Sequence, residues 1–65
     1  MSAKVCRIFA DGVLSAVATA RCSPASARSQ LQAVYGAVEK AAREESDGRE
    51  LRECLQALDD AANHI

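Results

Sequence analysis

The chain has few of the residues that build large cores, tight turns or strands. Its 65 residues include no Trp, one Phe, one Tyr, one Pro and three Gly. Of its 32 apolar residues, 14 are Ala and three are Cys, which leaves 15 large apolar side chains. A chain this short forms one domain rather than two. Because large apolar side chains are scarce, an enzyme that encloses its substrate in a deep cavity is not expected.

Runs in which apolar and polar residues alternate are also absent, so strands are not expected. Apolar side chains instead recur every three or four residues in three segments. This spacing predicts helices over about residues 3–21, 24–45 and 48–63. The sequence therefore predicts an all-α fold with a single domain over residues 1–65, a compact three-helix bundle made of a helical hairpin plus a third helix.

Two breaks in the pattern mark the helix boundaries. Ser23 followed by Pro24 is typical of a helix start, with Ser as the N-cap and Pro in the first helical position. Asp47 with Glu50 three residues later resembles a capping box. These two breaks predict the starts of the second and third helices.

The apolar positions of the three segments define the expected core. Its members are Val5, Ile8, Phe9, Val13, Val17, Leu31, Val34, Tyr35, Val38, Leu51, Leu55 and Leu58. Gly36 interrupts the second helix at a cost of about 1 kcal/mol relative to Ala, which predicts that another backbone approaches closely there. On the outer face, Glu39 with Arg43 and Lys40 with Glu44 have the i, i+4 spacing of helical ion pairs.

The first helix is apolar around most of its circumference. Its polar residues form one thin stripe, made of Lys4, Arg7, Asp11, Ser15 and Thr19. Two helices of the same chain would cover only about half of such a helix. A partner is therefore expected to cover the rest, and we predict a homodimer with Ile8, Leu14 and Val17 in the interface.

Charge is distributed unevenly along the chain. Residues 1–30 carry a net charge of +3 and residues 31–65 carry −4. On the third helix, an acidic surface for a basic partner is predicted from Glu50, Glu53, Asp59 and Asp60. Together with the apolar helix, this surface predicts a small non-enzymatic module that binds another protein as a regulator, inhibitor or co-chaperone.

The alternative is a regulator that binds nucleic acid. In a dimer, the basic residues of the N-terminal half would be brought together; they are Lys4, Arg7, Arg21 and Arg28. Against this hypothesis, the second helix becomes balanced in charge after its first turns, and no aromatic platform is available for single strands. Nucleic acid is therefore not the partner that the sequence favours.

The three cysteines do not have the spacing of a metal site. Cys6 and Cys22 are too far apart on one helix to share an ion or form a bridge. If the first and third helices run parallel, Cys54 lies level with Ala10, one turn away from Cys6, so a Cys6–Cys54 disulfide is an open alternative. An odd count favours free thiols that pack as small hydrophobic side chains in a reducing compartment. We expect no metal and no cofactor.

No catalytic, membrane or family motif is present. The serines lack the G-x-S-x-G pattern, no Gly-rich phosphate loop occurs, and the single His64 lies at a helix end. No uncharged apolar stretch of about 20 residues is available to span a membrane. Lys4 and Arg7 before an apolar run have the outline of a signal peptide, but Asp11 interrupts that run. The sequence thus predicts a cytoplasmic protein that is not an enzyme.

Overall fold

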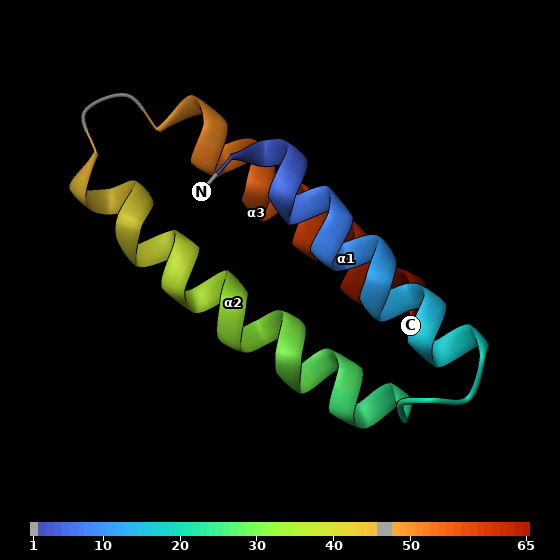
Figure 1. The fold of residues 1–65 in the computed structure, drawn as a ribbon. Coiled ribbons are helices and arrows are strands. Elements are labelled where there is room, and N and C mark those ends of the chain that lie inside the picture. Colours follow the sequence, from blue (N-terminus) through green and yellow to red (C-terminus); the bar gives the residue numbers. More distant parts are fainter. Residues whose placement is uncertain (1, 46–47) are drawn as a thin grey trace.

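Three α-helices lie along one another in the computed structural model, which describes residues 2–45 and 48–65 (Figure 1). α1 spans Ala3–Ala18, α2 spans Pro24–Glu44 and α3 spans Arg49–His64. α1 and α3 lie side by side and run in the same direction, and α2 returns antiparallel to both. The described chain contains no strand. The predicted all-α, three-helix bundle is confirmed, with helix boundaries within three residues of those expected.

Serine side chains cap the starts of the first two helices. The hydroxyl of Ser2 accepts a hydrogen bond from the backbone N–H of Val5 at 3.2 Å. The hydroxyl of Ser23 does the same for the N–H of Ser26 at 3.2 Å, with Pro24 at the start of α2. The predicted cap at Ser23 is confirmed. Such caps pair backbone donors that the first turn of a helix leaves without a partner.

α1 ends at Ala18, about three residues earlier than predicted. The N–H of Ala20 bonds to the carbonyl of Val17 at 3.1 Å, and the N–H of Arg21 bonds to the carbonyl of Ala16 at 2.8 Å. This pair of bonds forms a Schellman motif, which reverses the chain at the helix end. It places Ala20 in the left-handed region at φ 60°, where glycine is the usual residue. Because no glycine marks this turn, the spacing of apolar residues in the sequence predicted the end of the helix too late.

The start of α3 is linked to the start of α1. Gly48 is the N-cap of α3, and Asp47 of the predicted capping box lies outside the described residues. The carboxylate of Glu50 accepts a hydrogen bond, through Oε1, from the backbone N–H of Ala3 at 3.3 Å. The first turns of the two parallel helices are therefore level with each other.

Small side chains make up most of the core. The buried members are Ala3, Cys6, Ala10, Val13, Ala27, Leu31, Val38, Cys54, Leu58 and Ala61. Other predicted core residues are half-buried against them; they are Phe9, Val17, Val34, Tyr35, Leu51 and Leu55. The prediction was wrong for Val5 and Ile8, which are 52% and 62% exposed. The helical period turns Cys6, Ala10 and Val13 toward the other two helices, and it leaves Val5 and Ile8 on another side of α1.

Two further expectations about α2 have different outcomes. Gly36 is exposed, and a Cβ atom added to it would meet nothing within 4 Å, so the predicted close approach of another backbone is wrong. The predicted ion pair between Glu39 and Arg43 is confirmed at 3.4 Å. Lys40 and Glu44, both within the described part of α2, make no ion pair.

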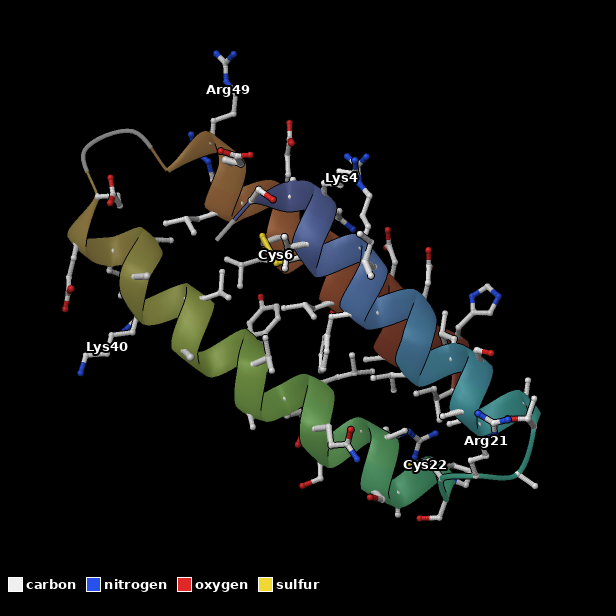
Figure 2. All side chains as sticks on the ribbon, viewed as in Figure 1. Lys4, Cys6, Arg21, Cys22, Lys40 and Arg49 are labelled. Carbon is white, nitrogen blue, oxygen red and sulfur yellow. A yellow bond between two sulfur atoms is a disulfide. The ribbon has the colours of Figure 1, made fainter. Side chains whose placement is uncertain are left out.

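A disulfide joins Cys6 of α1 to Cys54 of α3, with their Cα atoms 5.3 Å apart (Figure 2). The preferred prediction of three free thiols is therefore wrong, and only the half-buried Cys22 is a free cysteine among the described residues. The reason is the register of the parallel helices. Relative to α3, α1 is shifted along its axis by about one turn from the predicted position, so Cys54 lies beside Cys6 and not beside Ala10.

Candidate functional site

The three helices do not cover one another equally. α1 and α2 contact each other far less than either of them contacts α3. In Figure 1 the ribbon of α1 follows α3 closely, whereas α2 runs at a greater distance from α1. The side of α1 that points away from α3 is consequently left without a covering helix.

This uncovered side of α1 carries apolar residues and glycine. Among the described residues, Val5 and Ile8 are the exposed large hydrophobic side chains, and Gly12 beside them is exposed with open space where a Cβ would be. Phe9 and Ala16 are half-buried at the edge nearest to α2. Their spacing of three or four residues places them on one helix face. We call these five residues, Val5, Ile8, Phe9, Gly12 and Ala16, the docking strip.

An open groove of about 380 Å³ continues from the docking strip toward the start of α2. Its lining residues carry no charge; they are Ile8, Phe9, Gly12, Val13, Ala16, Cys22 and Gln30. The amide of Gln30 lies 3.8 Å from the sulfur of Cys22 at the α2 side. The groove is an apolar surface, and its polar groups are confined to one edge.

The predicted interface residues of α1 lie in different surroundings. Ile8 is exposed on the docking strip, as a contact with a partner requires. Leu14 and Val17 are half-buried and pack against the core, so each offers less surface to a partner. Sequence reasoning did not assign Val5 and Gly12 to the interface, although their positions three residues before and four residues after Ile8 are the signal that would have found them.

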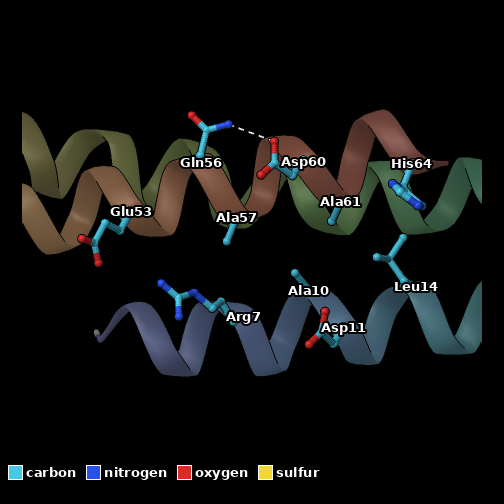
Figure 3. Close-up of a pocket in the computed structure, with 10 residues that line it drawn as sticks. All are labelled: Arg7, Ala10, Asp11, Leu14, Glu53, Gln56, Ala57, Asp60, Ala61 and His64. Carbon is cyan, nitrogen blue, oxygen red and sulfur yellow. Dashed lines mark hydrogen bonds between the residues drawn. The ribbon is translucent and has the colours of Figure 1, made fainter.

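A second groove, of about 430 Å³, lies on the surface along the contact between α1 and α3 (Figure 3). Small side chains from both helices form its floor; they are Ala10, Ala57 and Ala61. Charged and polar side chains surround the floor; they are Arg7, Asp11, Glu53, Gln56, Asp60 and His64. Gln56 donates a hydrogen bond through Nε2 to Oδ1 of Asp60 at 2.9 Å. Unlike the docking strip, this groove is a mixed polar surface.

The acidic residues predicted to form one surface on α3 are divided between two sides of the helix. All four are exposed; they are Glu50, Glu53, Asp59 and Asp60. Glu53 and Asp60 line the α1–α3 groove together with Arg7. Asp59 lines a separate groove between α2 and α3, of about 360 Å³, together with Arg28. Three of the four carboxylates thus share a groove with an arginine.

The basic residues of the nucleic-acid hypothesis are also spread over the molecule. Lys4 lies in the first turn of α1 and Arg21 follows its last turn, so the length of the helix separates them (Figure 2). Arg7 and Arg28 line different grooves. Within one copy of the chain these four cations therefore share no single face.

Within residues 2–45 and 48–65, no three His, Cys, Asp or Glu side chains gather closely enough to hold a metal ion. The same part of the chain buries no polar or charged side chain. None of its helices combines the length and the apolarity that crossing a membrane requires.

Comparison with known proteins finds no matching family model, no matching curated protein and no matching solved structure. The most distinctive feature of the chain's own geometry is the docking strip of α1.

Proposed function

We propose that this chain is a small non-enzymatic protein-binding module whose docking strip binds a helix of another polypeptide. The observation that carries the proposal is the exposure of Ile8, at 62%, beside Val5, at 52%. Fully burying one such side chain stabilises a protein or a complex by about 1.5–3 kcal/mol. In a chain with only 15 large apolar side chains, leaving these two outside the core favours an external contact.

The occupant that the docking strip fits is a second copy of the chain. Ile8 projects from the strip, whereas Gly12, one turn away, leaves an open space. In an antiparallel pair of α1 helices around a twofold axis, Ile8 of each copy lies against Gly12 of the other. The strip is therefore complementary to itself, and both contacts form at once.

The proposed biological role is that of a small regulator, inhibitor or co-chaperone that recognises its target by surface complementarity. The carboxylates of Glu53, Asp59 and Asp60 remain available on the faces away from the docking strip, where they favour a basic target. No cofactor is part of the proposal.

A cytoplasmic location was predicted from the expectation of free thiols and from Asp11, which interrupts the signal-peptide-like run; the Cys6–Cys54 disulfide removes the first of these two reasons. Disulfides persist mainly in oxidising compartments.

Sedimentation equilibrium over a range of concentrations tests the proposal. We expect the wild-type chain to dimerise, and we expect Gly12→Arg to raise the dissociation constant by about tenfold or more because a long charged side chain then occupies the contact. Gly36→Arg is the matched control, since both glycines are exposed helical positions with open space around them.

Two outcomes would refute this assignment. One is a wild-type chain that stays monomeric at every concentration. The other is a dimer that both substitutions weaken equally, because that result would place the interface elsewhere or show a general loss of structure.

A further inference from the structure

We propose that the Cys6–Cys54 disulfide is a redox latch that holds the first two turns of α1 on α3, and that reduction frees these turns while the rest of the bundle stays packed. The bond joins the beginning of α1 to α3 across 48 residues of sequence. It lies at the end of α1 where the buried side chains are small and the large apolar ones are exposed.

Within Ala3–Ile8, the side chains that pack inward are small. Ala3 and Cys6 are the buried residues of this segment, at 6% and 1% exposed. Its large apolar side chains, Val5 and Ile8, project into solvent. The hydrogen bond from the N–H of Ala3 to Glu50 is a further link from this segment to α3, and Sγ of Cys54 lies 3.4 Å from the carbonyl oxygen of Ser2, the N-cap of α1.

The second half of α1 is held differently. Ala10 and Val13 are buried in the core, and Leu14 and Val17 are half-buried against it. The Schellman turn then joins the helix to the segment before α2. Because none of these contacts depends on the disulfide, reduction is expected to affect the first two turns and to spare the second half of α1.

The reductant is a dithiol. Its thiolate attacks one sulfur of the Cys6–Cys54 bond, that bond breaks, and a mixed disulfide forms with release of the other cysteine as a thiolate. The second thiol of the reductant then displaces the first cysteine. Two electrons and two protons pass to the protein, which gains two thiols, and the reductant becomes a disulfide. Cys6 and Cys54 are 1% and 0% exposed, so the reductant reaches them only when the first turn opens.

Release of these turns also changes the docking strip. Val5 and Ile8 belong to the freed segment, whereas Gly12 and Ala16 lie beyond it. The strip is thus a continuous helix face only in the oxidised chain, and reduction would weaken docking by removing this preorganisation. This last consequence rests on the proposed function, whereas the latch itself does not.

Hydrogen exchange of individual amides, with and without a small dithiol such as dithiothreitol, tests the latch. A stabilising osmolyte is included in both states so that the reduced chain stays folded. On reduction, the exchange rates of the Arg7, Ile8 and Phe9 amides should rise at least about tenfold more than those of residues 14–17, whose exchange rises only through the loss of global stability. C6A/C54A should behave like the reduced chain in both conditions, and C22S should behave like the wild type.

The same measurement on Gly12→Arg separates the effect of reduction on the first turns of α1 from any effect of dimerisation, because that variant is expected to be monomeric. Unchanged exchange at Arg7, Ile8 and Phe9 would overturn the latch. Equal loss of protection in all three helices would also overturn the latch, because the bond would then stabilise the whole bundle and not the first turns of α1 in particular. Three reactive thiols in the unreduced, denatured wild type would show that the bond does not form.

Discussion

The backbone N–H of Ala3 donates a hydrogen bond of 3.3 Å to the carboxylate of Glu50, so a side chain in the first turn of α3 caps the start of α1. Helix N-termini carry unpaired N–H donors and a partial positive charge, and a carboxylate satisfies both. This contact, together with the disulfide one turn further along, sets the register of the two parallel helices.

Removing the carboxylate of Glu50 should destabilise the fold. We expect Glu50→Ala to lower the free energy of unfolding by about 1 kcal/mol, the usual cost of losing an N-terminal cap. Urea unfolding at neutral pH measures it. Glu53→Ala is the control on the same helix, because Glu53 is also exposed but makes no such bond. Equal losses in the two variants would contradict the capping role.

Reduction of the disulfide should lower the free energy of unfolding by about 4 kcal/mol, because the bond closes a loop of 48 residues in the unfolded chain. Urea unfolding with and without dithiol gives the difference. Thiol titration of the denatured protein should count one thiol before reduction and three after it. C22S serves as the control and should lose as much stability on reduction as the wild type. An unfolding midpoint that does not change on reduction would contradict this prediction.

The turn after α1 can be improved. Ala20 has a φ of 60°, a conformation that is unfavourable for an L-residue and easy for glycine. We expect Ala20→Gly to raise the free energy of unfolding by about 0.5–1 kcal/mol. Ala18→Gly, two residues earlier and still helical, should lower it by a similar amount. Thermal or urea unfolding decides this, and two changes of the same sign would argue against the Schellman geometry.

Gly36 offers a second stabilising change. It is exposed within α2, and an added methyl group meets nothing within 4 Å. Gly36→Ala should therefore stabilise the fold by up to about 1 kcal/mol, the difference in helix propensity. The reverse change at the exposed neighbour, Ala37→Gly, should cost about as much. A destabilised Gly36→Ala protein would mean that another backbone does approach this position.

The parts of the fold that local residues determine could be predicted from the sequence. Ser23 and Pro24 mark the start of α2 because a cap and a fixed φ act over a few residues. The end of α1 was missed because its turn uses Ala20 where glycine would have been a signal. The disulfide was only an alternative, since the register between Cys6 and Cys54 depends on how two distant helices pack.

The docking strip could be predicted only in outline. The sequence shows that α1 has more apolar surface than two helices can cover. It does not show which part stays uncovered, because a helix that is apolar on most sides has no contrast between its faces. Ala3, Ala10 and Val13 lie inside while Val5 and Ile8 lie outside, and this choice follows from the tight α1–α3 contact. Leu14 and Val17 were expected at the interface but pack against the core for the same reason.

The most direct test of the docking strip is an isotope-filtered NMR experiment on the oxidised chain, in which labelled and unlabelled copies are mixed in equal amounts. If two α1 helices pair as proposed, nuclear Overhauser effects will connect the methyl groups of Ile8 in one copy with the Hα protons of Gly12 in the other. If the Ile8 methyl groups instead show no contact with the second copy and remain open to a water-soluble paramagnetic probe at high concentration, a second copy does not cover α1 and the proposal is wrong.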